Sequence, residues 1–231
     1  MRRHFLLEEK CMLTDERLTA IMEMLPVCGT VADIGTDHGR LGAQLLLSGK
    51  CDKVYFTDIS SPSLDKARKL IEKIGLQEKS AFFVGDGAKA LPSAPDACVI
   101  AGMGGVTIIE ILKGSNGLLE NAKLILQPNV HVYEVRKYLM ENGFRIFDEK
   151  CVIAARRKYI LIGAEKGEAS YSKTQLYAGP VLLKTRTKEF LEYALFRKHV
   201  IEKALKGASG SNRNEISDFG DELKIWEEVL G

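Results

Sequence analysis

The stretch "VADIGTDHGRLG", residues 31–42, joins an apolar run to a turn rich in glycine and acidic residues. An apolar strand that runs into a glycine-rich turn is the usual start of a nucleotide-binding α/β domain. A dinucleotide-binding loop would read G-x-G-x-x-G and would bring bare backbone amides to a pyrophosphate. This turn carries Asp33 and Asp37 instead, whose carboxylates would repel phosphate. The stretch therefore predicts a ligand with a cation, an amine and a ribose but no phosphate.

S-adenosylmethionine has these groups, and the residues that end the later apolar runs suit it in order. Asp58, 25 residues after Asp33, can accept hydrogen bonds from both ribose hydroxyls, and Asp86, between two glycines, can accept one from the adenine amino group. Gly102 and Met103 would then lie against the adenosine and the methionine. We expect S-adenosylmethionine as the cofactor, and the residues expected to bind it are Asp33, Gly35, Thr36, Asp37, His38, Gly39, Asp58, Ile59, Asp86, Gly87, Gly102 and Met103.

Some of these residues also have a plainer interpretation. Asp58 and Asp86 could be helix N-caps or turn residues, as aspartate commonly is. His38 could be a packed or capping side chain with no part in a site. The ordered set favours a binding site, because ligands of open α/β sheets lie beyond the carboxyl ends of the strands.

Apolar runs alternate with helical stretches through the first two thirds of the chain. The predicted strands are residues 30–35, 53–59, 80–87, 96–105 and 122–129; the predicted helices are 14–26 (with Thr14 as N-cap), 41–49, 61–76, 106–114 and 132–143. Continuous apolar strands separated by helices indicate a parallel sheet covered on both faces. Residues 144–165 form a closing pair without a helix, so that edge is expected to be antiparallel. The fold class is α/β, with a Rossmann-like, mostly parallel seven-stranded sheet in a domain of residues 1–166.

Residues 167–231 are predicted to form a C-terminal helical hairpin domain. Residues 170–180 are interpreted as a polar connector, followed by one long helix to about Lys206 and a second helix at 215–230. Apolar residues recur there at three- and four-residue spacing, as in a coiled coil. The predicted seam consists of Leu183, Phe190, Ala194, Ile201 and Ala204 in the first helix and Ile216, Phe219, Leu223, Trp226 and Leu230 in the second. Two helices joined by a short loop fold back as an antiparallel hairpin.

The composition of the 231 residues is ordinary for a globular protein, with 45% apolar and 28% charged residues. No apolar run approaches the ~18 residues of a membrane span, and the start of the chain is a poor signal peptide. The five cysteines stand singly, which indicates reduced thiols in a cytoplasmic protein and suggests no metal site. We expect no membrane partner and a monomer or weak dimer.

The net charge of +2 hides an uneven distribution. Residues 156–206 contain twelve Lys and Arg against five Asp and Glu. A local positive field attracts a polyanion even when the whole chain is nearly neutral. The expected substrate-binding residues come from this segment, from the end of the fifth strand, which could line a base pocket, and from the turn after the first strand. They are Arg40, Gln127, Pro128, Asn129, Arg156, Arg157, Lys158, Lys184, Arg186, Lys188, Arg197 and Lys198.

The motifs "VADIGTDHGRL", "FTDIS", "GDG", "IAGMGG" and "LILQPN", followed by a helical hairpin, resemble the bacterial tRNA adenine-22 N1-methyltransferase family over residues 14–230. The resemblance implies a class I methyltransferase domain, a C-terminal coiled-coil-like domain, S-adenosylmethionine as methyl donor and tRNA as substrate. Family members typically read D-H-x-Y-L-P where this chain has Asp37 to Gly42. Arg40 thus replaces an aromatic residue and Gly42 a proline, although arginine can also stack on a base or bind phosphate.

Adenine N1 carries a lone pair, so its methylation mainly needs donor and nucleophile in line. Methylation of an exocyclic amine often uses an Asp/Asn-Pro-Pro-aromatic turn after the fourth strand, where this chain has "GMGG", which favours a ring nitrogen. Asp37 is the candidate catalytic carboxylate, either stabilising the cationic base or accepting a proton. It could equally bind only the amine of the donor. A methyltransferase of small molecules and a non-catalytic tRNA-binding protein remain as alternatives.

Overall fold

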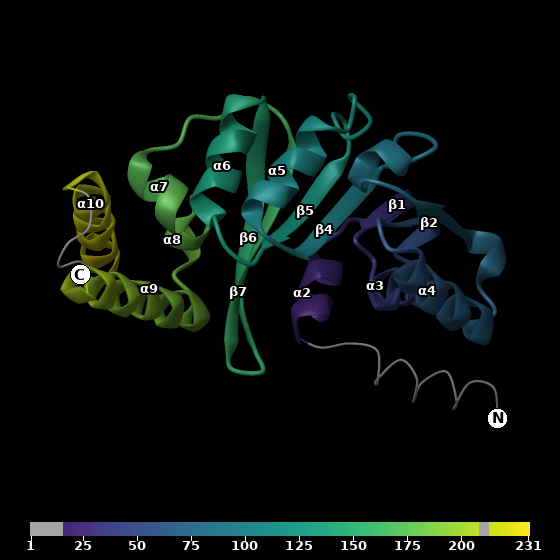
Figure 1. Cartoon of the computed structure of the whole chain (residues 1–231), viewed down its shortest axis with the longest axis horizontal. Helices are drawn as coiled ribbons and strands as arrows, with labels where there is room; N and C mark the ends of the chain where they lie inside the picture. The colour runs from purple at the N-terminus through teal and green to yellow at the C-terminus, as the bar shows by residue number, and fades with distance from the viewer. Residues whose placement is uncertain (1–15, 208–212) are drawn as a thin grey trace.

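The computed structural model describes residues 16–207 and 213–231, whose strands form one seven-stranded sheet in the order β3-β2-β1-β4-β5-β7-β6 (Figure 1). The strands are β1 (Cys28–Ile34), β2 (Cys51–Asp58), β3 (Ser80–Val84), β4 (Ala97–Met103), β5 (Lys123–Pro128), β6 (Phe144–Ala154) and β7 (Arg157–Lys166). Strands β1 to β5 pair in parallel, and β7 runs antiparallel to both β5 and β6. The predicted mostly parallel sheet with an antiparallel edge is confirmed.

Helices cover both faces of this sheet. They are α2 (Glu16–Met24), α3 (Arg40–Leu47), α4 (Ser61–Ile74), α5 (Gly105–Lys113), α6 (Val132–Glu141), α7 (Lys173–Ala178), α8 (Leu182–Thr185), α9 (Lys188–Gly207) and α10 (Arg213–Leu230), with short 3-10 helices at Gln77–Lys79 and Gly87–Ala90. Thr14, the predicted first N-cap, lies outside the described residues. None of the described helices combines the length and the apolar character that crossing a membrane requires.

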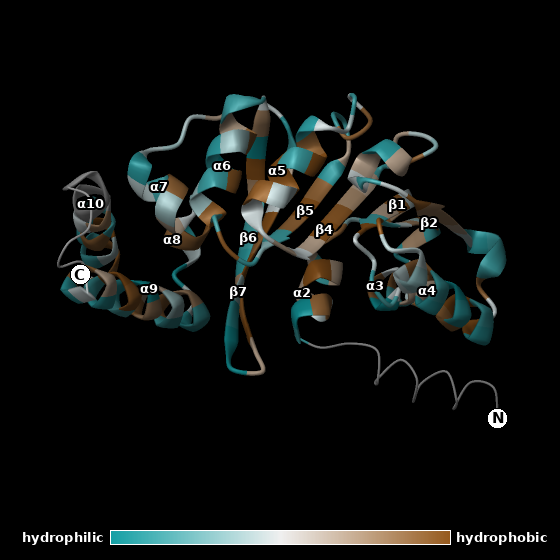
Figure 2. Cartoon of the chain, viewed as in Figure 1, coloured by the Kyte–Doolittle hydropathy of each residue, from teal (hydrophilic) through white to brown (hydrophobic). Residues whose placement is uncertain are grey.

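Two hydrophobic clusters lie on the two faces, because side chains alternate along each strand. Val31 of β1 belongs to the cluster under α2, α3 and α4, whereas Ala32 and Ile34 belong to the cluster under α5 and α6. Figure 2 shows the central strands as a continuous apolar band between helices of mixed polarity. In the central strands β1, β4 and β5, polar side chains therefore gather towards the strand ends, where the candidate site lies.

The C-terminal helices pack on the α5 and α6 face, and their course differs from the prediction. The connector at residues 170–180 contains α7, which begins with a capping box in which Ser172 and Gln175 exchange hydrogen bonds of 3.2 and 2.9 Å. The long helix is broken at Arg186, whose φ of +45° is left-handed. Thr187 then starts α9 by accepting the Phe190 amide at 3.3 Å.

Helices α9 and α10 pack against each other, as predicted, but the seam on α10 is shifted. Trp226 is buried, whereas Phe219, Leu223 and Leu230 are only partly buried and Ile225 and Val229 take their place in the core. The side chain of Ile216 lies outside the described part. In α9 the predicted Phe190, Ala194 and Ile201 are buried and Ala204 is partly buried, as is Leu183, which lies in α8. The reason for the shift is that α10 faces α7 as well as α9.

A buried ion pair joins these helices to the sheet. Arg136 Nε of α6 donates to Glu149 Oε1 of β6 at 2.7 Å, and the two side chains are 1% and 0% exposed. Arg136 Nη1 also donates to the carbonyls of Leu176 and Tyr177, while Glu149 Oε2 accepts the Val181 amide at 2.9 Å. The pair thus satisfies backbone groups at the end of α7 and the start of α8.

Breaking this pair is expected to be costly. Arg136→Ala leaves Glu149 charged and buried, so we expect the free energy of unfolding to fall by about 3–5 kcal/mol. Lys137→Ala removes an exposed pair with Glu141 from the same helix and should cost below about 0.5 kcal/mol. Urea unfolding followed by circular dichroism checks both values. Equal losses for the two variants would show that the buried pair does not stabilise the fold.

Candidate functional site

The turn after β1 is held in an unusual backbone conformation. Gly35 has φ of +74° and Asp37 has φ of +50°, a left-handed value that aspartate tolerates better than most residues. The Gly35 and Thr36 amides donate to the Thr57 carbonyl at 2.8 and 3.1 Å, which ties the turn to the end of β2. The turn therefore lies at the carboxyl ends of β1 and β2.

Asp33 is the buried acid of the site, with 5% of its surface exposed. Burial raises its pKa from 3.8 to about 6, and the charge of Asp58 adds to the rise. Hydrogen bonds from the Thr36 hydroxyl (2.7 Å) and the Gly42 amide oppose it. A cationic ligand would relieve the cost of this buried negative charge.

Asp58 and Asp86 lie at the ends of the next two strands and differ in their partners. Asp58 accepts the Asp37 amide at 3.2 Å and the Ser60 amide at 2.8 Å, so the interpretation as a turn residue holds for it in part. Each carboxylate oxygen can still accept another hydrogen bond. Asp86 makes no capping hydrogen bond; it pairs with Lys89 at 2.6 Å and is exposed. Both acids remain available to a ligand.

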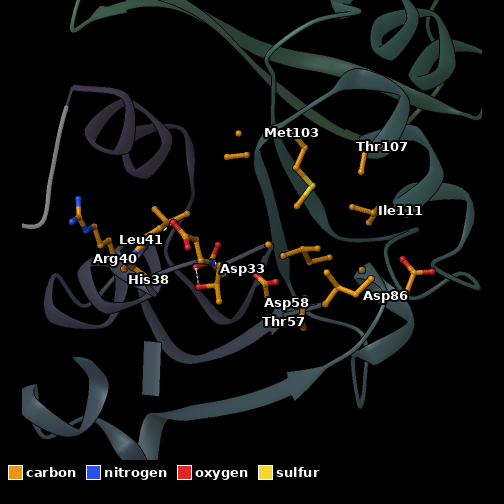
Figure 3. A pocket seen from close by; sticks show the side chains of 18 of the residues that line it. Asp33, His38, Arg40, Leu41, Thr57, Asp58, Asp86, Met103, Thr107 and Ile111 are labelled. Carbon is orange, nitrogen blue, oxygen red and sulfur yellow. Dashed lines mark hydrogen bonds and ion pairs between the residues drawn. The ribbon is translucent and has the colours of Figure 1, made fainter. Parts of the chain in front are cut away.

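A cavity of about 700 Å³ opens above these strand ends (Figure 3). Eleven of the twelve residues predicted to bind the donor line it. The exception is Gly39, where an added Cβ would lie 2.7 Å from that of Ala67 on α4. In Figure 3 Asp58 lies between Asp33 and Asp86, and Met103, Thr107 and Ile111 form another part of the wall. The lining thus combines carboxylates with apolar groups.

The cavity fits the parts of S-adenosylmethionine. Acids from three successive strands can meet the amine, the ribose hydroxyls and the adenine amino group, and Ile59 and Ile111 offer apolar contact. The Thr57 hydroxyl is buried, lines the cavity and has no hydrogen-bond partner among the described residues. A Cβ at Gly35 would lie 2.0 Å from Met103 Cε, so the end of the Met103 side chain would have to shift within the cavity.

A polar network borders this cavity at the ends of β4 and β5. The fully buried Gln127 accepts at Oε1 from Arg17 Nη1 (2.9 Å) and from the Gly102 amide (3.1 Å). Its Nε2 donates to Asn129 Oδ1 at 2.9 Å, and Asn129 Nδ2 donates to the Gly102 carbonyl at 2.8 Å. Pro128 is buried in β5. Gln127 therefore orients its neighbours, whereas Asn129 and Arg17 reach the surface.

A second cavity of about 680 Å³ adjoins the first, since Arg17 and Gly102 line both. Its other lining residues are Asn129, Arg156, Arg157, Lys158, Tyr159 and Phe196. The β6–β7 turn that carries the basic residues has Ala155 at φ +46° and Arg156 at φ +63°, with no glycine to ease it. Strained turns of this kind are frequent at functional sites.

The remaining residues predicted to bind substrate lie farther out or have other partners. Lys184, Arg186 and Lys188 are exposed on α8 and α9 and line none of the described cavities. Arg197 pairs at 2.5 Å with the buried Glu222, which also accepts Trp226 Nε1 at 2.9 Å. Lys198 lies 3.4 Å from Glu227. Arg197 in particular is part of the packing between α9 and α10.

Three residues of the second cavity were not predicted from the sequence. Arg17 lies at the start of α2, and Tyr159 and Phe196 belong to β7 and α9. Arg17 also lies over the Tyr159 ring, 5.5 Å from its centroid. These three residues do not form a motif in the sequence. Phe196 alone gave a signal for a site, because it is an aromatic residue outside the predicted helical seam.

Arg40 and Gly42, the two departures from the family pattern, lie in different surroundings. Gly42 is required here, because a Cβ would lie 2.2 Å from the Phe56 ring of β2. The glycine therefore lets α3 pack closely on the sheet. Arg40 is exposed and lines the first cavity, called the donor cavity below, where it can meet a ligand.

Comparisons with known sequences agree with this site. A family profile for a methyltransferase domain matches residues 14–162. A Bacillus subtilis tRNA (adenine(22)-N(1))-methyltransferase is 29% identical over 228 residues, covering 93% of this chain and 96% of its own length. The chain belongs to this methyltransferase family. A Mycoplasma pneumoniae protein with the provisional name of tRNA methyltransferase is 30% identical over 165 residues, 69% of this chain and 75% of its own.

A solved structure connects the methyltransferase to its donor. A Streptococcus pneumoniae protein, provisionally named a tRNA (m1A22) methyltransferase and solved with S-adenosyl-L-methionine, superimposes with a TM-score of 0.86 at 27% identity. The match covers 94% of this chain and 99% of that one. S-adenosylmethionine is therefore the cofactor of this methyltransferase, as its sequence predicted.

Gly35 offers a test of the donor cavity. Gly35→Ala places a methyl group against Met103, so we expect affinity for S-adenosylmethionine to fall at least about tenfold, measured by calorimetry. Gly49→Ala is the matched control, because Gly49 has a similar φ of +69° but nothing within 4 Å. Both variants carry left-handed strain of about 1 kcal/mol. Equal affinities would show that Gly35 matters only for its backbone.

Asp33 predicts a pH dependence of stability. An acid whose folded pKa is raised from 3.8 to about 6 stabilises the fold fully below pH 3.8 and loses that contribution as the pH rises through 6. Above pH 6 the buried charge costs up to about 3 kcal/mol. Asp33→Asn is therefore expected to raise the free energy of unfolding at pH 7.5, and progressively less towards pH 4.

Urea unfolding at pH 5, 6 and 7.5 measures this difference without donor. Asp52→Asn, at an exposed position of β2, is the control and should leave the free energy of unfolding unchanged. A gain for Asp33→Asn that did not change with pH would contradict the assignment to a buried charge.

Proposed function

We propose that this methyltransferase transfers the methyl group of S-adenosylmethionine to N1 of an adenine in tRNA, at position 22. The observation that carries the proposal is that the donor cavity shares two wall residues, Arg17 and Gly102, with a second cavity whose wall also holds Arg156, Arg157 and Lys158. Such a basic surface suits phosphates of a nucleic acid. The Bacillus subtilis relative is named for this reaction.

The chemistry needs little beyond positioning. S-adenosylmethionine supplies an electrophilic methyl group, and adenine N1 supplies the lone pair that attacks it. The chain must hold the two in line and exclude water. The end of β4 and the residues after it read "GMGG" and not Asp/Asn-Pro-Pro-aromatic, which supports a ring nitrogen as the target.

Asp37 is proposed as the catalytic carboxylate. It lines the donor cavity beside Arg40 and accepts His38 Nδ1 at 2.6 Å. As the base gains positive charge, this carboxylate would stabilise it or accept a proton from the exocyclic amine. The alternative, in which Asp37 binds only the amine of the donor, predicts a loss of donor affinity instead.

The tRNA is proposed to be held by phosphate contacts and to present an unstacked adenine. Arg156, Arg157 and Lys158 would bind phosphates next to the site. The exposed Lys184, Arg186 and Lys188 and the partly exposed Lys198 would bind phosphates farther along the C-terminal helices. Gln127 and Pro128, both buried, would shape the base pocket, and Asn129 would contact the base. An adenine in folded tRNA must leave its stack to reach them.

We further propose that residues 1–166 bind the donor and that residues 167–231 add a tRNA-binding arm. The cluster that joins α9 and α10 to the sheet supports a fixed placement of this arm. The protein is proposed to work in the cytoplasm as a monomer or weak dimer, with neither a metal nor a membrane taking part.

The decisive measurement is methylation of an unmodified tRNA transcript with labelled donor, followed by nucleoside analysis. We expect 1-methyladenosine with adenine at position 22 and no label when guanine replaces it. Asparagine tolerates the left-handed conformation of position 37, so Asp37→Asn adds little backbone strain. We expect this variant to lower kcat by about 10²–10⁴-fold while donor affinity stays unchanged.

Each contrary outcome would contradict a different part of the proposed function. Label in the guanine variant would overturn the proposed position, and no label in any tRNA would overturn the substrate. A fall in donor affinity of Asp37→Asn that accounts for the whole loss of rate would assign Asp37 to the amine of the donor.

A further inference from the structure

Phe196 is an aromatic residue that the packing of α9 does not explain. The helix buries Phe190, Ala194 and Ile201 on its inner side. Phe196 follows Ala194 by two residues, which turns it about 200° around the helix. Its exposed fraction is 47%. An exposed ring on the outer side of a helix contributes little to the core, so its surroundings decide what it can do.

Those surroundings are the second cavity and the one beyond it. Phe196 lines the second cavity together with Arg17 and Gly102, which also line the donor cavity. It lines a third cavity of about 390 Å³ as well, with Lys158 and Asn129 shared between the two. Of the other two cavities, the second shares lining residues with the donor cavity and the third shares none. The ring therefore belongs to the wall of the space that adjoins the donor.

The Phe196 ring has a contact from β7, and the residue that follows it is tied to α10. Lys158 Nζ lies 5.1 Å from the centroid of the Phe196 ring, a cation–π contact across from β7. The next residue, Arg197, is held at 2.5 Å by Glu222, a buried carboxylate that also accepts from Trp226. The backbone that carries Phe196 is therefore anchored to α10.

The groups around Phe196 match the parts of a nucleotide. A purine has an apolar face that stacks on an aromatic ring, and base–aromatic stacking is a main source of affinity for unstacked bases. Arg156 and Arg157 offer charges to a phosphate. The Asn129 amide, oriented by Gln127 and by the Gly102 carbonyl, offers hydrogen bonds to a base edge at the boundary with the donor cavity.

We propose that the second cavity receives the target adenine and that Phe196 is the ring on which this adenine stacks. The inference rests on the proposed function, because the base must lie within contact of the methyl group and the second cavity is where that boundary lies. Phe196 is then a specificity-determining residue that holds the plane of the base.

The experiment compares four proteins by steady-state kinetics with an unmodified tRNA transcript. Phe196→Ala removes the ring and Phe196→Trp keeps a stacking surface. Leu195→Ala is the matched control, because Leu195 is the neighbouring exposed residue of α9, at 57%, and lines none of the three cavities. We expect Phe196→Ala to raise KM for tRNA at least about tenfold. The tryptophan variant and the control should remain near the wild type, and donor affinity should be unchanged in all four.

A second readout follows the base itself. In a transcript with 2-aminopurine at the target position, stacking quenches the fluorescence, so the saturated complex should be brighter with Phe196→Ala than with the wild type or Phe196→Trp. A structural role of Phe196 would not produce this pattern.

The outcomes separate the inference from the proposed function. If the wild type forms 1-methyladenosine but Phe196→Ala behaves like Leu195→Ala in both readouts, the stacking role is wrong and the function stands. If the wild type does not methylate tRNA, the proposed function and the inference fall together.

Discussion

The ion pair between Arg136 and Glu149 is the interaction on which the placement of the C-terminal helices depends. The chain passes so close to it that a Cβ at Gly179 would lie 2.6 Å from Glu149 Oε2 and 2.8 Å from Arg136 Nη2. A charged pair in a fully buried position gains little net stability over an apolar pair, but it accepts only partners with matching hydrogen bonds. Here those partners are backbone groups of residues 176, 177 and 181. The pair therefore sets where α8 and α9 begin relative to the sheet.

The donor side of the site illustrates a different balance. Its acids lie at the ends of parallel strands whose middles are apolar on both faces, and Asp33 is buried among them. Without a ligand such a carboxylate weakens the fold at neutral pH. A cationic ligand in the cavity would gain from the same charge, because the protein has already removed most of the water around this carboxylate. The buried charge of Asp33 thus lowers the stability of the ligand-free fold and would strengthen the binding of a cationic ligand. Such an exchange of stability for binding is common at functional sites.

The donor side could be predicted from the sequence because each part is local. A run of buried strand residues, an acid at its end and a glycine after it stand next to one another, and the parallel order of strands brings the acids together. The second cavity could not be predicted in this way. Arg17, Arg156 and Phe196 come from α2, the β6–β7 turn and α9, and only tertiary packing brings them to one wall. The break before α9 was missed because Arg186 adopts a left-handed conformation that a sequence signals only through glycine or asparagine. Helix α7 did have a signal, the capping box at Ser172 and Gln175.

The position of Arg17 between the two cavities bears on how the binding of one ligand affects the affinity for the other. Its guanidinium is tied to Gln127, and through it to the Gly102 amide, while the side chain borders both the donor cavity and the basic cavity. Any shift of Arg17 that one ligand favours changes the wall that the other ligand meets. Thermodynamic linkage then requires the effect to be reciprocal: the factor by which bound donor alters affinity for RNA equals the factor by which RNA alters affinity for the donor. With donor in one cavity and RNA at the other, as proposed, Arg17 is the shared side chain through which such a coupling would act.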